Sequence, residues 1–215
     1  GTSNTSSAQN PVHIFSAGGN DTVKLIVANS FGCLDTVSYV VTVNEAPMAA
    51  FSADTACLGS PTQFTDESTT ATPGTVVAWS WTFGDPASGT NNTSTLQNPT
   101  HIYNTAGTYT VILQVTNSTQ CVKDTSMVIE VFPKPSAMFE YSAACIGDST
   151  QFTDLSISPG SQVESWLWDF GCGTGTCTAT IQNPKWMYSA PGTYNVKLVV
   201  TNLSGCKDSV TIAVI

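Results

Sequence analysis

The sequence predicts an all-β chain of tandem antiparallel β-sandwiches, the first of which is present only as its C-terminal half. Three observations favour this fold class. Apolar and polar residues alternate along short segments, and no segment shows a helical period. Turns rich in Gly, Pro and Asn separate these segments at roughly 8–12-residue spacing, which is typical of sandwiches. Long stretches of the chain also recur, which indicates a repeat architecture.

The most regular repeat is a segment that begins with Asn-Pro and ends with Cys. "NPTHIYNTAGTYTVILQVTNSTQC" at 98–121 returns as "NPKWMYSAPGTYNVKLVVTNLSGC" at 183–206 and, more loosely, as "NPVHIFSAGGNDTVKLIVANSFGC" at 10–33. In each copy the Asn and the Cys are 23 residues apart. A fixed spacing through varied sequence indicates one structural unit used three times.

The segments that precede this repeat occur only twice. "CLGSPTQFTD" at 57–66 matches "CIGDSTQFTD" at 145–154, and "WSWTFG" at 79–84 matches "WLWDFG" at 166–171. The first unit therefore lacks its front half, which we expect upstream of residue 1 or supplied by a neighbouring chain. Proline-containing boundaries at "VNEAPMAAF" and "VFPKPSAMF" give units at 1–46, 47–134 and 135–215.

Each expected strand is justified by its alternation. In "TYTVILQVTN", Tyr109 and the valines and leucine that follow at every second position share one face, and the third unit repeats the pattern. The first unit keeps the apolar face but has Asp21 at the tyrosine position. "TQFTD", "WSWTF" and "DTSMVIEVF" are further strands. The expected core aromatic residues are Trp81, Phe83, Tyr109, Trp168, Phe170 and Tyr194.

The seven cysteines favour structural disulfides in an oxidising compartment, because no metal-like CxxC pair is present. The repeat symmetry predicts Cys57–Cys121 and Cys145–Cys206 bonds within units. Each would close a loop of about 60 residues, worth roughly 4 kcal/mol in the chain-entropy model. Cys172–Cys177 would be a local pair, and Cys33 would bond to a partner upstream of residue 1. The alternative is a set of free buried thiols.

The composition excludes two classes of partner. The net charge is −9 with only six Lys and Arg, which argues against nucleic acid because phosphate binding needs basic residues. No apolar run approaches the 18 or so residues of a membrane span, and no signal peptide is visible. Hydrophobic residues make up 41% of the chain and charged residues 10%, which fits folded β structure rather than disorder.

The order "WLWDFG", "NPKWMY", "GTYNVKLVVTN" resembles the PKD (polycystic kidney disease) domain family, and "WTFGD", "NPTHIY", "GTYTVILQVTN" shows the same order in the second unit. The resemblance implies an Ig-like β-sandwich, strung in arrays on secreted or cell-surface proteins. The bracketing cysteines resemble those of large Bacteroidetes surface proteins, including gliding-associated adhesins exported by the type IX system. Thr82, Pro86 and Cys172 depart from the family's acidic turn.

Several side chains are candidates for ligand contact. Trp79, Trp166 and Trp186 are candidates for a carbohydrate-stacking platform, with core packing as the alternative. Trp186 is the best candidate for exposure. Calcium is a second candidate ligand, and its carboxylates would be Asp66, Asp85, Asp154 and Asp169. Turn capping is the alternative for them, because no DxDxDG loop appears and no cofactor is expected.

Catalysis finds no support in the sequence. His13 and His101 occupy equivalent positions in two repeats, and neither has the context of a nucleophile elbow or a catalytic triad. These histidines are therefore interpreted as architectural, and the chain is not expected to be an enzyme.

Five Asp-Ser/Thr dipeptides resemble the O-glycosylation motif of Bacteroidetes, with ordinary turn dipeptides as the alternative. The candidate hydroxyls belong to Thr22, Thr36, Thr55, Ser149 and Ser209.

The sequence thus favours structural or adhesive spacer repeats of a long extracellular bacterial surface protein or filament. The expected partners are other repeats of the same chain, surface polysaccharide, host or substratum proteins, or the secretion and motility machinery. The alternative is an accessory carbohydrate- or protein-binding module of a secreted hydrolase.

Overall fold

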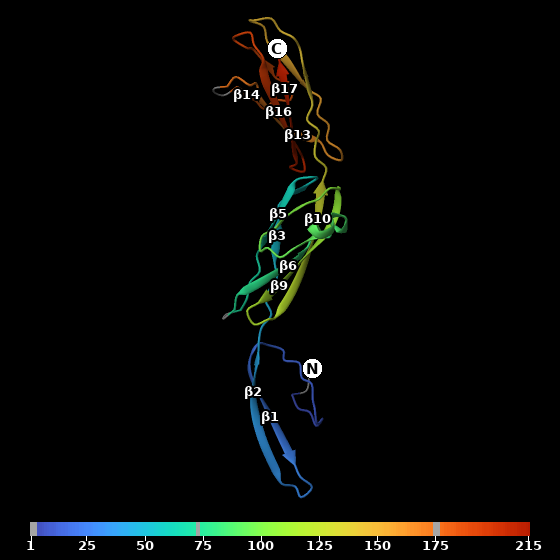
Figure 1. Cartoon of the computed structure of the whole chain (residues 1–215), viewed down its shortest axis with the longest axis vertical. Coiled ribbons are helices and arrows are strands. Elements are labelled where there is room, and N and C mark those ends of the chain that lie inside the picture. Colours follow the sequence, from blue (N-terminus) through green and yellow to red (C-terminus); the bar gives the residue numbers. More distant parts are fainter. Residues whose placement is uncertain (1–3, 72–73, 174–176) are drawn as a thin grey trace.

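Three β units follow one another in an extended row, with the first unit at one end and the C-terminus near the other (Figure 1). The computed structural model describes residues 4–71, 74–173 and 177–215. The first unit consists of a hairpin and the segment before it, the second unit of strands β3 to β10, and the third unit of β11 to β17. Within the described residues, no helix has the length and apolar character needed to cross a membrane.

The second unit is a sandwich of two sheets whose strands pair antiparallel, except for the short parallel pair of β4 and β10. One sheet has the strand order β4-β10-β9-β6-β7, and the other has the order β3-β5-β8. A short 3-10 turn, η1 (Pro86–Asn92), connects β6 to β7. The strands are β3 (Phe51–Ala53), β4 (Ala56–Cys57), β5 (Pro61–Asp66), β6 (Val76–Thr82), β7 (Thr93–Ser94), β8 (Thr100–Ile102), β9 (Gly107–Asn117) and β10 (Val122–Phe132).

The third unit repeats this arrangement. Its sheets have the orders β14-β13-β16-β17 and β11-β12-β15. The strands are β11 (Phe139–Tyr141), β12 (Thr150–Asp154), β13 (Val163–Asp169), β14 (Thr178–Ala179), β15 (Lys185–Trp186), β16 (Tyr194–Asn202) and β17 (Lys207–Val214). The predicted all-β sandwich fold is therefore confirmed.

Aromatic side chains from the two sheets form the core of each unit. In the second unit, the Phe64 ring lies 5.7 Å from Trp81 and 5.2 Å from Phe83. In the third unit, the corresponding distances from Phe152 are 5.6 and 5.2 Å. Four predicted core residues are fully buried, as expected: Trp81, Phe83, Trp168 and Phe170.

Tyr109 and Tyr194 lie at the edge of the core rather than inside it. Both are half-buried, and their hydroxyls donate to the carbonyl oxygens of Thr105 (2.9 Å) and Ala190 (2.8 Å). A phenol needs a partner for its hydroxyl, so an edge position satisfies both the ring and the polar atom. The ring of Tyr188 stacks on that of Tyr194. Burial is the main cause that raises the pKa of Tyr188 to about 12, and the charge of the ionised Tyr194 phenol is the second cause.

Glycine ends the tryptophan strand in both units because the backbones approach closely there. Gly84 and Gly171 have φ of 71° and 73°. A Cβ at Gly84 would lie 2.4 Å from the Thr110 carbonyl oxygen, and one at Gly171 would lie 2.6 Å from that of Asn195. These contacts explain why each "FG" pair recurs in the sequence.

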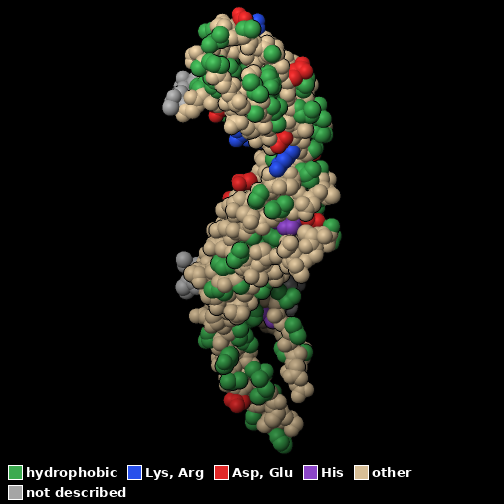
Figure 2. All heavy atoms as spheres, turned by 45° about the horizontal axis from the view of Figure 1, so that its top comes forward, with side chains coloured by type: hydrophobic (Ala, Val, Ile, Leu, Met, Phe, Trp, Pro, Cys, Tyr) green, Lys and Arg blue, Asp and Glu red, His purple; other side chains and the backbone are tan. Residues whose placement is uncertain are grey.

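The first unit contains one two-stranded sheet, β1 (Gly19–Ala28) paired with β2 (Leu34–Val43). Its register matches the β9–β10 hairpin, since Asp21 faces Val41 as Tyr109 faces Ile129. Leu25 is 55% exposed, whereas its counterpart Leu113 is fully buried. Hydrophobic side chains accordingly lie at the surface of this end of the molecule (Figure 2). Among the described residues, no second sheet covers the hairpin.

Candidate functional site

A disulfide joins the second unit to the third. Cys57 and Cys206 are bonded with their Cα atoms 5.7 Å apart, although they are 149 positions apart in sequence. Cys206 is fully buried at the junction, and Cys57 is half-buried. This covalent link between domains is the most specific chemical feature of the chain, and it makes the junction the candidate functional site.

The predicted bonds within units, Cys57–Cys121 and Cys145–Cys206, are wrong. Cys121 precedes the first residue of β10, whereas Cys57 pairs with Phe132 at the last residue of that strand. Eleven strand residues separate the two positions, a distance of about 36 Å at 3.3 Å per residue. A disulfide needs Cα atoms within about 7 Å. The early and late cysteines of one unit therefore lie at opposite ends of the sandwich.

Strand β4 places Cys57 at the junction. Ala56 and Cys57 run parallel to the end of β10 and pair with Val131 and Phe132. The Leu58 amide also donates to the Phe132 carbonyl oxygen at 2.9 Å. The last strand of the second unit thus ends beside Cys57 and leads directly into the third unit.

The turn between β16 and β17 places Cys206. The Asn202 amide donates to the Cys206 carbonyl (3.0 Å), and the Cys206 amide donates to the Asn202 Oδ1 (2.9 Å). The Asn202 Nδ2 then donates to the carbonyl oxygen of Pro133 in the linker at 3.2 Å. The buried Asn202 therefore fixes both the shape of the turn and its contact with the preceding unit.

The role of this asparagine was not predicted from the sequence, although a signal was present. An Asn stands four residues before the closing Cys in all three repeats, at Asn29, Asn117 and Asn202. Each accepts a hydrogen bond from the amide of that Cys through its Oδ1.

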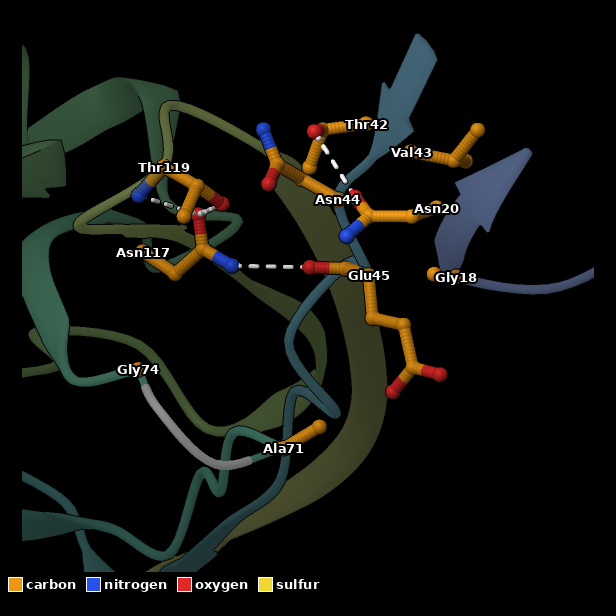
Figure 3. A pocket seen from close by; sticks show the side chains of 11 residues that line it. Gly18, Asn20, Thr42, Val43, Asn44, Glu45, Ala71, Gly74, Asn117 and Thr119 are labelled. Carbon is orange, nitrogen blue, oxygen red and sulfur yellow. Dashed lines mark hydrogen bonds between the residues drawn. The ribbon is translucent and has the colours of Figure 1, made fainter. Parts of the chain in front are cut away.

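The junction between the first and second units has the same contacts. The Asn117 Nδ2 donates to the Glu45 carbonyl oxygen at 2.8 Å (Figure 3). Asn202 donates to Pro133 in the same way. The Cys121 Sγ lies 3.8 Å from the Asn44 carbonyl oxygen, and the Cys206 Sγ lies 3.9 Å from that of Phe132.

Cys121 itself is a free thiol, and a cavity of about 420 Å³ adjoins its turn. Asn44 and Glu45 line this cavity from one unit, and Asn117 and Thr119 line it from the other. The first junction therefore has the same geometry as the second without its covalent bond.

The remaining cysteines differ in their state. Cys172 and Cys177 form the local disulfide expected from the sequence, and residues 174–176 between them lie outside the described part. Cys33 and Cys145 are exposed free thiols. The bond of Cys33 to an upstream partner stays a prediction.

Trp79 and Trp166 are half-buried, and each indole is tied to a carboxylate. The Trp79 Nε1 donates to the Asp66 Oδ2 at 2.7 Å, and the Trp166 Nε1 donates to the Asp154 Oδ2 at the same distance. Burial alone would raise the pKa of Asp66, but hydrogen bonds from Ser68, Trp79 and Gln97 outweigh it and lower that pKa below 3.8. Trp79 therefore braces the end of β5 and Trp166 the end of β12, and neither ring extends from the surface.

Trp186 does not have the exposure expected of it, because it stacks on the core. Its ring lies 4.5 Å from Phe170 with the planes 10° apart, and the ring of His101 lies on Phe83 in the same way, at 4.5 Å and 9°. The buried His101 also contacts Asp85 at 3.2 Å. The position held by His101 and Trp186 is therefore a packing site, at which either flat ring can stack on the core phenylalanine.

The four candidate calcium carboxylates are spread over different contacts. Asp66 and Asp154 bond indoles, Asp85 bonds His101, and Asp169 accepts from the Gly171 amide at 2.9 Å. Among residues 4–71, 74–173 and 177–215, no three His, Cys, Asp or Glu side chains form a group suited to a metal ion. Asp66, Asp154 and Asp169 cap turns, as the alternative had it, because each Oδ1 accepts from the amide two residues further on.

The candidate glycosylation hydroxyls are all on the surface. Thr22, Thr36, Thr55, Ser149 and Ser209 are exposed.

Comparison with known proteins adds a family and several relatives. The model of the PKD domain matches residues 44–131 and 132–215. Collagenase ColA of Bacillus cereus is 39% identical over 80 residues, which make up 36% of this chain and 8% of the collagenase. The chain therefore spans a small part of the length of this relative.

Solved structures of single domains are also similar. The PKD1 domain of Vibrio anguillarum Epp is 30% identical, with a TM-score of 0.36, over 41% of this chain and 96% of that domain. The PKD1 domain of the Vibrio cholerae metalloprotease PrtV is 30% identical, with a TM-score of 0.35, over 40% of this chain and 98% of that domain.

Proposed function

Because the chain belongs to the PKD domain family, we propose that it is a structural spacer of a long extracellular protein or filament. Its β-sandwich domains are held in line by contacts and disulfides at their junctions, so that the array projects a distant binding element. The observation that supports this most is the Cys57–Cys206 bond, because it links two domains instead of closing one.

The linker between these domains leaves little freedom. Residues 133–138 separate β10 from β11. Pro133 accepts from Asn202, and the Ala137 amide donates to the Asp208 Oδ2 at 2.9 Å. A short linker tied at both ends and spanned by a disulfide favours a stiff pair of domains over a flexible one.

The disulfides also bear on location. Structural disulfides persist in oxidising compartments, which favours a secreted or surface-exposed array. We extend this proposal to a surface protein of the Bacteroidetes type. It would be exported by the type IX system and glycosylated at the five exposed hydroxyls. Its partners would be neighbouring repeats, surface polysaccharide, host or substratum proteins, or the motility machinery.

The first unit is proposed to be the back half of a further domain. The apolar face of its hairpin is exposed where the matching face of the second unit is buried, as Leu25 and Leu113 illustrate. A front half from the same or a neighbouring chain would bury that face. We propose the corresponding unit boundaries at 1–46, 47–134 and 135–215.

The second candidate is an accessory binding module of a secreted hydrolase, which the similarity to part of a collagenase favours. Its weakness is that Trp79, Trp166 and Trp186 are half-buried and engaged in hydrogen bonds or stacking. Sedimentation of the chain with insoluble collagen and with polysaccharide beads tests this candidate. Retention on either that is lost in Trp186→Ala would favour the module over the spacer.

Small-angle X-ray scattering tests the spacer. The oxidised chain should give the maximum dimension of an extended rod, and Cys57→Ser should broaden the distribution of dimensions because the junction loses its covalent tie. Cys145→Ser is the matched control, since it removes an exposed free thiol, and it should scatter like the parent. Identical, broadly distributed scattering from all three proteins would contradict a spacer role.

A further inference from the structure

The free thiols Cys121 and Cys145 occupy the two positions that are bonded to each other across the second junction. Cys121 is the counterpart of Cys206, and Cys145 is the counterpart of Cys57. Neither can reach the other cysteine of its own unit. In the third unit, Cys206 precedes β17, and Cys145 lies beside the far end of that strand. Eight strand residues separate the two positions, or about 26 Å.

The surroundings of Cys121 match those of bonded Cys206 closely. Both sulfurs lie 3.8–3.9 Å from a carbonyl oxygen at the end of the preceding unit, and both follow an Asn that donates to the next residue of that unit. Cys121 is therefore held where an early cysteine of a preceding complete domain would reach it. The cavity lined by Asn44 and Glu45 of one unit and by Asn117 and Thr119 of the other adjoins the turn that carries Cys121 (Figure 3).

The surroundings of Cys145 provide the other half of the site. A groove of about 150 Å³ lies between Ala144–Cys145 and the end of β17, and Tyr188 and Tyr194 line it. In the second unit the matching space is filled, because Val131 and Phe132 run parallel to Ala56–Cys57 and Val131 is 1% exposed. Since Val214 pairs with Tyr194 as Ile129 pairs with Tyr109, a continuation of β17 by two or three residues would enter this groove.

We propose that the cysteines form a staggered ladder, in which the early cysteine of each repeat bonds to the late cysteine of the next repeat. Cys145 is then the acceptor site for the late cysteine of a following PKD repeat, whose strand continues β17 through the groove. Cys121, and by the same rule Cys33, receives the early cysteine of the preceding repeat. This inference rests on the proposed spacer function and names the partner at each free end.

The chemistry is the oxidation of two thiols by a disulfide reagent. One thiol of the pair, as its thiolate, attacks oxidised glutathione or an oxidised dithiol oxidoreductase and forms a mixed disulfide. The second thiolate displaces the reduced carrier and forms the bond between repeats. Two protons and two electrons leave the cysteine pair, and one carrier disulfide becomes two thiols.

The test extends the full chain by one repeat in register. A second copy of residues 131–215 is fused after Ile215, so that Val131 and Phe132 of the copy continue β17. The protein is refolded with oxidised glutathione, remaining thiols are alkylated, and the unreduced digest is mapped by mass spectrometry. The two copies give identical peptides, so we expect about half of the Cys145 peptide to be joined to the Cys206 peptide and the other half to be alkylated.

Two variants keep the outcome interpretable. Cys206→Ser in the added copy should leave Cys145 of both copies alkylated. Cys57→Ser in the unextended chain should leave both Cys145 and Cys206 alkylated, because they lie at opposite ends of one unit. A Cys145–Cys206 bond in the unextended Cys57→Ser chain, or complete alkylation of Cys145 in both copies of the folded extended chain, would overturn the ladder.

The same digest separates this inference from the proposed function. The Cys57–Cys206 and Cys172–Cys177 peptides report that the original domains and their junction have folded. If both are present and Cys145 stays free, the ladder fails and the spacer proposal stands. If Cys57–Cys206 is absent, the spacer proposal loses its main support.

Discussion

Substitution of Cys57 by serine should destabilise the third unit, although Cys57 belongs to the second. If the third unit unfolds while the second stays folded, the disulfide closes a loop that runs from Phe132 to Cys206, which are 74 positions apart. The chain-entropy relation for a loop of this length gives about 4 kcal/mol at 25 °C. The Cys57→Ser variant should lose about this free energy of unfolding from the third unit.

Hydrogen exchange followed by mass spectrometry measures this loss unit by unit. The slowest amides of β16 and β17 exchange when the third unit unfolds, and a loss of about 4 kcal/mol speeds their exchange about 1,000-fold. The amides of β9 and β10 should also exchange faster, because the second unit loses a constraint of similar length. Cys145→Ser, in which no disulfide is removed, should leave both sets of amides unchanged.

The reasoning would be refuted by either of two results. Unchanged exchange in β16 and β17 of Cys57→Ser would mean that the bond does not constrain the third unit. Faster exchange of the same strands in Cys145→Ser would instead indicate a Cys145–Cys206 bond.

The remaining predictions concern the frame of the domains. Asp66→Asn should remove the charge-assisted bond from Trp79 and lower stability by about 1–3 kcal/mol near neutral pH. Because folding lowers the pKa of Asp66 below 3.8, the carboxylate stabilises the fold above that pH, and this stabilisation is lost as the pH falls. The free energies of unfolding from urea titrations at pH 7 and pH 2.5 should therefore differ less for Asp66→Asn than for the parent chain. An equal difference in the two proteins would contradict this role. Gly84→Ala should cost more than Gly89→Ala in the same urea titration, because both have positive φ but only Gly84 has a backbone oxygen 2.4 Å from the added Cβ; equal losses would exclude the close approach as the cause. Trp168→Ala should destabilise the third unit by about 3–5 kcal/mol, read from the exchange of its strands, and a loss below 1 kcal/mol would show that this buried ring is not central to the core.

The strands and the core could be predicted because they depend on local patterns. Alternation placed Tyr109 and Leu113 on one face, and the spacing of Trp81 and Phe83 placed both inside. Such patterns report which face of a strand is buried, so they identify the sandwich without knowledge of how its strands connect. The hydroxyls of Tyr109 and Tyr194 moved these rings to the edge of the core, an effect that apolar alternation does not contain.

The disulfide pairing could not be predicted in the same way. Repeat symmetry is equally consistent with bonds inside each unit and with bonds between neighbours, because both give every unit the same pattern. Only the direction of the strands distinguishes them, since β10 carries the chain from Cys121 to the far end of the sandwich, where Phe132 meets Cys57. That distance depends on tertiary structure, so the pairing within units that was predicted from repeat symmetry is wrong.

The bond from Cys57 to Cys206 also changes the route by which tension would travel along the molecule. If both ends were pulled, the force would pass from Cys57 to Cys206 through the disulfide. The segment between these cysteines, which are 149 positions apart, would carry no tension. At about 3.4 Å per residue, the bypassed segment could extend to about 500 Å, and none of this length is released while the bond is intact. An array of such domains would resist stretching because of the disulfides between its domains. Reduction of these disulfides would make the same array extensible.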